Sequence, residues 1–263
     1  MLNGLIPPYT PSGRSALVES PPWHYAGQAL SLSFSVNRET AQALLPPGCG
    51  FATGRAAAHF CEWQATTDGS ELLDPIYAQY KEFIVLIELD RGGEHWFFCP
   101  FIYVDQDISL ARGWLQGWPK KMGSVWMTRS YDLVHPAAAQ IKPGQAFGAS
   151  LAVKDRRLAE ATIRLTGDLS PPLGFFSAPT VGLVAPPSII GGAQKGEMKL
   201  VRAQIGQKIT GPAYAATGEL RLFGSPRDEL ALLQPTEMGP ASLSTFALTV
   251  EGAIEVAPLR AEG

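Results

Sequence analysis

The sequence predicts a single α+β domain dominated by antiparallel β-sheet, and three observations support this. The 22 prolines and 27 glycines are spread along the whole chain, which suits many strands joined by turns better than long helices. Several segments alternate polar and apolar residues with period two, the pattern of a half-buried strand. There is no βαβ rhythm and no glycine-rich phosphate loop, so a doubly wound nucleotide-binding fold is not expected.

The chain is long enough for one large domain. Its 263 residues are 46% hydrophobic, with six Trp, seven Tyr and twelve Phe, so there is ample apolar surface to bury. No run of low hydrophobicity resembles a linker. We therefore expect one domain over residues 1–263.

The first elements follow from local signals. Residues 28–36 alternate polar and apolar side chains and predict a strand. The next segment predicts a helix, because Asn37 can cap its N-terminus, Glu39 lies in its first turn and the prolines at 46–47 stop it. Residues 57–66 predict a second strand.

A hairpin is the clearest prediction in the middle of the chain. Residues 82–90 and 94–105 are rich in β-branched and aromatic residues, and the Arg-Gly-Gly at 91–93 between them is a turn signal. Further strands are expected over 124–132, 145–153, 161–167, 198–210, 218–224 and 244–257.

Two adjacent lysines, Lys120 and Lys121, follow a short helix that is expected over 107–116 with an aspartate cap. The helix should end before Trp118, because a residue that precedes proline disfavours the α-helical region. The lysine pair therefore lies just beyond a helix end.

Composition and charge exclude several classes of function. The formal net charge is −3 and no basic cluster is interleaved with aromatic residues, so a nucleic-acid partner is not expected. The sequence starts without the pattern of a secretory signal, and no apolar run reaches the roughly 18 residues of a membrane span. We therefore expect a cytoplasmic protein with no membrane association.

Neither a metal nor another cofactor is expected. The cysteines, Cys49, Cys61 and Cys99, are odd in number and match no zinc-binding spacing, which indicates ordinary buried thiols. The four histidines also lack the close spacing of metal ligands.

A lysine amine is a nucleophile only when it is neutral, and either burial or a second nearby cation lowers a lysine pKa. Lys120 and Lys121, flanked by Trp118, Met122 and Trp126, offer both influences. If the pair lies on a strand, the two side chains point to opposite faces, and burial becomes the main influence. The simpler alternative is a solvated surface turn, since lysine is mostly exposed.

Several motifs, in order, are similar to those of the acetoacetate decarboxylase superfamily. They are the Tyr-Lys-Glu at 80–82, the Pro-Phe-Ile-Tyr-Val-Asp at 100–105, the Gly-Trp-Pro-Lys-Lys at 117–121 and the block at 218–238 that contains Leu-Arg-Leu-Phe. The resemblance covers roughly residues 20–256. It implies one α+β domain built on a conical, largely antiparallel β-sheet with a few short helices, assembled as a homo-oligomer.

The resemblance also implies roles for individual residues. Lys120 takes the place of the lysine that forms a Schiff base, and Lys121 that of the neighbour that lowers its pKa. Glu82 takes the place of a pocket glutamate, where a carboxylate can steady an iminium ion or carry protons. Tyr80 and Trp118 are expected to contact the substrate.

Two departures from the family pattern make acetoacetate a doubtful substrate. The arginine that binds the substrate carboxylate should fall near Gln28, where there is none. A second pocket glutamate should fall at Cys61, whereas the neighbouring Glu62 should point to the other face of a strand.

Gln116 resembles a glutamine of the family's aldolase-dehydratase branch, which condenses pyruvate with aldehydes. A tyrosine near the C-terminus that assists in that branch has no match here. Judged from sequence alone, an amide that caps the last carbonyls of a helix is an equally good reading of Gln116.

The leading hypothesis is a lyase that forms an imine between Lys120 and a small oxo acid and catalyses aldol or retro-aldol condensation with dehydration. Decarboxylation of a 3-oxo acid is the alternative within the same chemistry. Two other classes stay open: a small-molecule binder without catalysis, and a lactone hydrolase in which Glu82 activates water.

Overall fold

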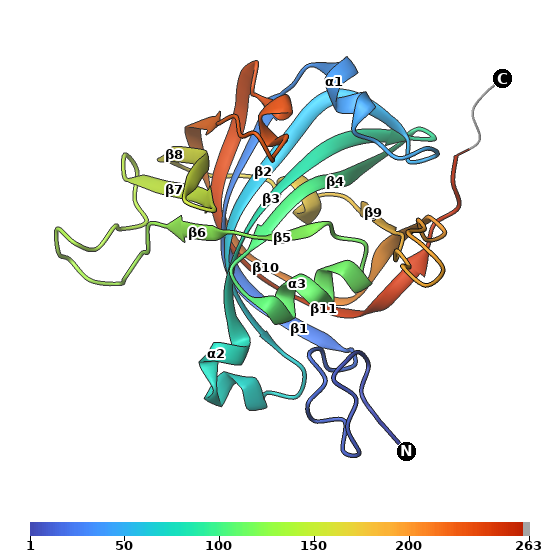
Figure 1. Ribbon diagram of the computed structural model, residues 1–263. Coiled ribbons are helices and arrows are strands. Elements are labelled where there is room, and N and C mark those ends of the chain that lie inside the picture. Colours follow the sequence, from blue (N-terminus) through green and yellow to red (C-terminus); the bar gives the residue numbers. More distant parts are fainter. Residues whose placement is uncertain (260–263) are drawn as a thin grey trace.

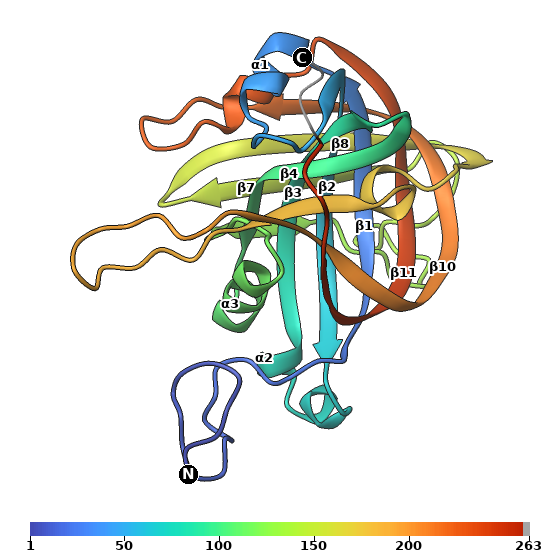
Figure 2. The ribbon, with the colours of Figure 1, turned by 90° about the vertical axis from the view of Figure 1, so that its right-hand side faces the viewer.

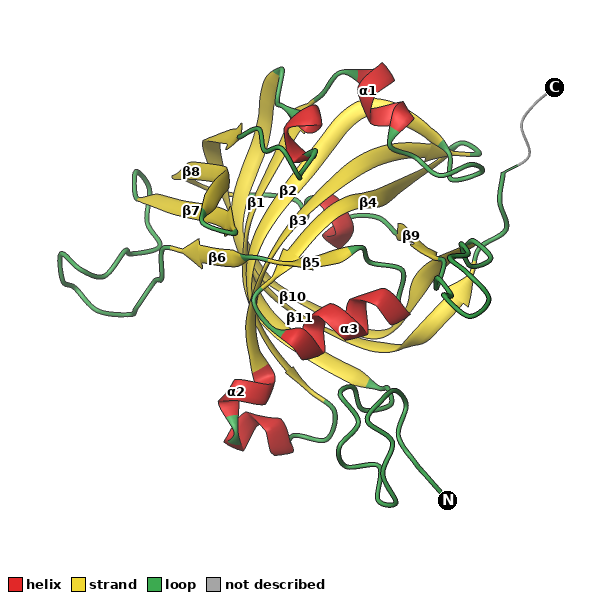
Figure 3. Cartoon of the chain, viewed as in Figure 1, coloured by secondary structure: helices red, strands yellow, loops and turns green. Residues whose placement is uncertain are grey.

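The computed structural model describes residues 1–259 and shows one strongly curved sheet with short helices at its margins (Figures 1 and 3). The helices are α1 (Arg38–Ala43), α2 (Pro75–Ala78) and α3 (Asp107–Leu115), with 3-10 turns η1 (Ser70–Leu73), η2 (Gly174–Phe176) and η3 (Leu230–Leu233). The strands are β1 (Trp23–Ser35), β2 (Phe51–Thr66), β3 (Gln79–Arg91), β4 (Glu94–Val104), β5 (Lys120–Met122), β6 (Ser124–Met127), β7 (Ala146–Val153), β8 (Arg156–Leu169), β9 (Thr180–Val184), β10 (Lys199–Leu222) and β11 (Glu237–Glu255).

Seven of these strands close into a barrel. Their order is β11-β1-β2-β3-β4-β9-β10, and β10 also pairs with β11, which completes the ring. All pairings are antiparallel except those of β4 with β5 and with β9. Both β5 and β9 pair with β4, at different points along it. The expected mostly antiparallel, curved sheet is confirmed.

The strand β10 belongs to the barrel and to an outer sheet at once (Figure 2). Its first residues pair with β9, its last residues pair with β8, and β7 and β6 continue the sheet from there. The sequence predicted two strands here, over 198–210 and 218–224. The structure instead has one strand of 24 residues.

Strand alternation divides the apolar residues of the barrel into two clusters. On β3, Phe83, Val85 and Ile87 face one cluster, which also receives apolar residues from β7, β8 and the end of β10. Tyr80 and Ile84 face the other cluster, together with residues of β1, β2 and β4. The second cluster lies inside the barrel and surrounds the pocket described below.

Most local signals in the sequence are confirmed. The Asn37 side chain accepts a hydrogen bond from the Thr40 amide at 2.8 Å and caps α1, and the 82–105 segment forms the expected hairpin with Gly92 and Gly93 in its turn. The N-cap of α3 is Gln106 instead of an aspartate. Strand β9 was not predicted. No helix among residues 1–259 is long and apolar enough to cross a lipid bilayer.

Candidate active site

The end of α3 sets the direction of the lysine segment. Gly117 has φ of +80° and follows the C-cap Gln116, a position where glycine avoids the steric cost of the left-handed region. The Trp118 amide donates to the Gly113 carbonyl at 2.9 Å and the Gly117 amide to the Trp114 carbonyl at 3.4 Å. This is a Schellman motif, and it turns the chain toward β5.

Lys120 is held against α3 by close packing. It begins β5 beside Ile102 of β4, and its carbonyl accepts a hydrogen bond from the Trp114 indole at 2.9 Å. A Cβ atom placed on Gly113 would lie 2.4 Å from the Lys120 Cδ atom. The absence of a side chain at Gly113 therefore provides the space that the lysine stem occupies.

The Lys120 amine lies between two oxygen atoms. Its Nζ donates to the Ser109 hydroxyl at 2.9 Å and lies 2.6 Å from Glu82 Oε2. The approach to Oε2 is off the direction of a hydrogen bond, so Oε2 accepts none from the described residues. Both charged side chains are buried, with 10% of Lys120 and 5% of Glu82 exposed. The amine is thus in direct contact with a carboxylate that can take up its proton.

The other titratable groups around this pair are kept neutral. Burial, reinforced by the charge of Glu82, raises the pKa of the Cys61 and Cys99 thiols well above the usual value. The same two causes raise the pKa of the Tyr80 hydroxyl. All three cysteines are free and buried, as expected. The two thiols and the Tyr80 hydroxyl are therefore poor bases, and Glu82 is the acidic side chain in contact with Lys120.

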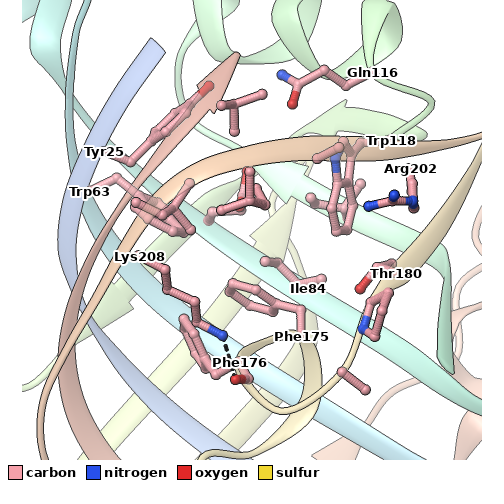
Figure 4. A pocket seen from close by; sticks show the side chains of 18 of the residues that line it. Tyr25, Trp63, Ile84, Gln116, Trp118, Phe175, Phe176, Thr180, Arg202 and Lys208 are labelled. Carbon is pink, nitrogen blue, oxygen red and sulfur yellow. Dashed lines mark hydrogen bonds between the residues drawn. The ribbon is translucent and has the colours of Figure 1, made fainter. Parts of the chain in front are cut away.

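Lys120, Glu82, Gln116, Tyr80 and Trp118 all line one cavity of about 350 Å³. The structure therefore brings together five of the six site residues expected from the sequence. Six aromatic side chains contribute to the walls, and Figure 4 shows most of them. These aromatic residues are Tyr25, Trp63, Tyr80, Trp118, Phe175 and Phe176.

Gln116 is the helix cap that the sequence allowed, and it also lines the cavity. Its amide Nε2 donates to the Arg112 carbonyl at 3.2 Å, which caps the last turn of α3. The same side chain is buried and lines the cavity. The helix cap fixes the amide, and the amide oxygen stays available to a ligand.

Lys121 is the expected site residue that does not line the cavity. It follows Lys120 on β5, so its side chain points to the opposite face, where its ammonium group forms an ion pair with Asp228. Asp228 also accepts a hydrogen bond from the Tyr103 hydroxyl at 2.6 Å. In this arrangement the charge of Lys121 is balanced outside the pocket.

Three cations near the cavity were missed by the sequence analysis. Arg202 and Lys208 line the cavity from β10. Arg112 is buried behind it, donates to the Tyr25 hydroxyl at 3.3 Å, and has an Nε atom with no partner in the described residues. Arg112 lies one helical turn before Gln116, a spacing that could have indicated it. For the two β10 residues, nothing in the sequence shows which face of the strand is inside.

Comparison of the sequence with protein families gives a match over nearly the whole chain. The sequence profile of the family described as acetoacetate decarboxylase matches residues 6–257. The chain belongs to the acetoacetate decarboxylase family. A search of curated protein sequences found no significant match.

Solved structures of this family share the fold. The enduracididine biosynthesis enzyme MppR, complexed with the condensation product of pyruvate and imidazole 4-carboxaldehyde, is 29% identical with a TM-score of 0.92, over 99% of this chain and 98% of that one. MppR complexed with pyruvate is 30% identical with a TM-score of 0.91, over 98% and 99% of the two chains. An acetoacetate decarboxylase-like enzyme from Sphingomonas wittichii RW1 is 23% identical with a TM-score of 0.88, over 97% and 100%.

The structure also shows where the two departures from the family pattern lie. Gln28 lies opposite Glu62 on paired strands, and both line a separate groove, where Glu62 Oε1 lies 3.3 Å from Arg129 Nε. Cys61 is paired with Glu82 across β2 and β3 and is fully buried. The positions near which the family resemblance placed an arginine and a second glutamate thus carry no charge into this pocket.

Proposed function

We propose that this protein is a lyase that forms an imine between Lys120 and a small oxo acid and uses it for aldol condensation followed by dehydration. The observation that carries the proposal is the 2.6 Å contact between the Lys120 amine and Glu82 inside an aromatic cavity. A nucleophile next to a base is the arrangement that imine formation needs. In the solved structures, MppR holds pyruvate or its condensation product with an aldehyde.

The steps follow from these groups. Glu82 takes a proton from the Lys120 ammonium, and the free amine attacks the oxo carbon of pyruvate, which loses water as the iminium ion forms. Glu82 gives its proton to the departing hydroxyl group, which leaves as that water, and Glu82 is again a carboxylate. It then removes a proton from the methyl group, and the electron pair of that C–H bond moves toward the iminium nitrogen to give an enamine. The enamine carbon bonds to the aldehyde carbon, and the aldehyde oxygen takes the proton from Glu82 to become a hydroxyl group. Glu82 then removes a second proton from the former methyl carbon and passes it to this hydroxyl, which leaves as water while a C=C bond forms. Hydrolysis of the imine releases the product and regenerates the lysine.

Gln116 and the aromatic residues have supporting roles in this proposal. The hydrogen bond from Gln116 Nε2 to the Arg112 carbonyl fixes the amide, and its oxygen then orients a hydroxyl or a protonated group of the substrate. Tyr80 and Trp118 form the walls that exclude water. Lys121 acts through its ion pair with Asp228, by holding β5 in place. Assembly as a homo-oligomer remains a prediction, which light scattering can check.

Borohydride trapping tests the proposal. The protein is incubated with pyruvate, and separately with acetoacetate, then reduced and mapped by peptide mass spectrometry. We expect an added mass on Lys120 with pyruvate and none in the Lys120→Met variant. Lys121→Met is the matched control and keeps the adduct on Lys120. Absence of an adduct on Lys120 in folded protein would contradict the imine mechanism.

Product analysis separates the remaining alternatives. Release of carbon dioxide from 3-oxo acids, without condensation of pyruvate and an aldehyde, would identify a decarboxylase. Hydrolysis of lactones that persists in Lys120→Met would identify a hydrolase, because that reaction does not need the amine. Condensation with loss of water, and without carbon dioxide, is the expected result.

A further inference from the structure

Arg112 is a buried cation without a carboxylate partner in the part of the chain that the structure describes. It is 7% exposed, and its Nε atom has no hydrogen-bond partner there. The ion pairs found among residues 1–259 all involve other side chains. Glu71, whose charge acts on Arg112 from a distance, is itself bonded to Thr66 and Thr67. Because a buried charge is costly unless it is paired, this cation favours an anionic ligand nearby.

Helix α3 brings Arg112 close to the reacting lysine. Ser109, Arg112 and Gln116 are three and four residues apart, a spacing that places them on one face of the helix. Ser109 accepts a hydrogen bond from the Lys120 amine at 2.9 Å, and Gln116 lines the cavity. Arg112 therefore lies between a residue that contacts the amine and one that lines the pocket.

Tyr25 connects this cation to the cavity. Its side chain lines the cavity and is 9% exposed, and its hydroxyl accepts a hydrogen bond from Arg112 Nη1 at 3.3 Å. The guanidinium carbon also lies 5.5 Å from the centre of the Tyr25 ring. A tyrosine hydroxyl that accepts one hydrogen bond can donate another, and Tyr25 donates none to the described residues. The hydroxyl thus keeps its proton for an acceptor in the pocket.

The Tyr25 hydroxyl belongs to the same part of the cavity as the amine. Figure 4 shows it turned toward Gln116. Trp63 packs between Tyr25 and Tyr80, with ring centres 5.7 Å from the first and 6.2 Å from the second. The Lys120 amine in turn lies 5.5 Å from the centre of the Tyr80 ring. One wall of contacts therefore runs from the reacting lysine to Tyr25.

We propose that the Tyr25 hydroxyl, with the Arg112 guanidinium behind it, binds the carboxylate of the oxo acid whose carbonyl carbon reacts at Lys120. The reaction at the lysine rests on the proposed function. Tyr25 donates a hydrogen bond to the carboxylate, and the carboxylate supplies the negative charge that Arg112 lacks. The positive charge that the family resemblance places near Gln28 comes in this chain from α3 instead.

Oxamate tests the binding step alone. It has the carboxylate and the shape of pyruvate, but its amide carbonyl is too poor an electrophile to form an imine, and methyl oxamate is its neutral counterpart. Calorimetry should show that the wild type prefers oxamate by about tenfold or more, the range for hydrogen bonds to charged groups. Tyr25→Phe keeps the ring and removes the hydroxyl. It should weaken oxamate binding about tenfold and change methyl oxamate binding less than twofold.

Arg112 acts through Tyr25, so its test is the preference for acid over ester. Arg112→Gln should lower that preference about tenfold, and Arg112→Lys, which keeps the charge, should restore part of it. A purely structural role would weaken acid and ester equally. Tyr77→Phe, which changes an exposed tyrosine of α2, is the matched control and should leave both affinities unchanged. If Arg112→Gln does not fold, Tyr25→Phe alone decides the test.

Borohydride trapping separates this inference from the proposed function. We expect Tyr25→Phe to need about tenfold more pyruvate for half-maximal trapping on Lys120, with the same trapping at saturation. A wild type that prefers oxamate but traps no pyruvate would contradict the imine mechanism and keep the carboxylate site. Equal affinity of wild type and Tyr25→Phe for oxamate would overturn the site. So would a Tyr25→Phe variant that is impaired only in the later condensation with an aldehyde.

Discussion

Adjacent lysines on one short strand have opposite environments. Lys120 is buried between Ser109 and Glu82, whereas about half of the Lys121 side chain is exposed beside Asp228. Since strand neighbours point to opposite faces, the two ammonium groups belong to different sites. The sequence could show the pair but not which of the two faces was inside the barrel.

Removing the charge of Lys121 should therefore have little effect on the chemistry. We expect Lys121→Met to keep the rate of imine formation with pyruvate within about threefold of the wild type, because Asp228 already balances that charge. Stability should fall by about 1 to 3 kcal/mol, because only 5% of Asp228 is exposed and its Oδ2 loses its partner, while Oδ1 keeps the hydrogen bonds from Tyr103 and Leu230. Stopped-flow trapping and urea unfolding measure the two quantities.

If imine formation in folded Lys121→Met is about a hundredfold slower, the result would favour the role implied by the family resemblance, in which Lys121 lowers the pKa of Lys120. Asp228→Asn helps to interpret that result. If Lys121 acts by holding β5 in place, Lys121→Met and Asp228→Asn should show similar small decreases in the rate of imine formation.

At the scale of elements, the close approach of α3 and β5 positions the amine. Glycine in a helix usually costs about 1 kcal/mol relative to alanine. Gly113 is needed despite this cost, because an added Cβ would lie 2.4 to 2.7 Å from three carbon atoms of the Lys120 side chain.

Gly113→Ala should thus impair activity without unfolding the protein. The lysine stem is flexible and can move, but its Nζ must then shift away from Glu82 and Ser109. We expect imine formation to slow by about tenfold to a hundredfold, as for other small displacements of reacting groups, while Tm changes by only a few degrees. The matched control is Gly224→Ala, where an added Cβ meets no atom within 4 Å. Unchanged trapping in Gly113→Ala would contradict this account.

The sequence predicted most of the helices and strands but few of the contacts between them. Period-two alternation found β1, β-rich composition with a glycine turn found the β3–β4 hairpin, and Asn37 marked α1 correctly. Local pattern also found β2. The sequence analysis missed β9, a short strand that pairs with β4 and β10, both distant from it in sequence. The cavity residues Arg202 and Lys208 were missed for the same reason, since the inner face of β10 depends on barrel closure and on bulges that no local pattern reveals.

At the scale of the whole molecule, closure of the barrel buries a histidine that plays no part in the proposed chemistry. His59 is fully buried on β2, with Nδ1 2.8 Å from the Ser31 hydroxyl and its ring against Phe175 and Phe176. Its Nε2 has no partner in the described residues. Burial lowers the pKa of His59 to about 3.

This burial predicts acid sensitivity of the fold. Below the ordinary histidine pKa of about 6.5 the unfolded chain binds a proton at this position, whereas the folded protein does not until about pH 3. The free energy of unfolding should therefore decrease as the pH falls through this window, by up to about 1.4 kcal/mol per pH unit from this group.

Urea unfolding at pH 7, 6 and 5 measures the effect. His59→Leu removes the titrating group, so its stability should depend less on pH than that of the wild type, although its stability at pH 7 can differ because the bond to Ser31 is lost. Identical slopes for the two proteins would show that His59 is not the source.

The long strand β10 also determines how the molecule can come apart. It contributes hydrogen bonds to the barrel wall and to the outer sheet through one unbroken backbone. The two apolar clusters therefore cannot lose their packing separately without breaking the pairing of a strand they share. We therefore expect the outer sheet and the barrel to unfold together, because neither can come apart unless β10 loses hydrogen bonds that the other also depends on.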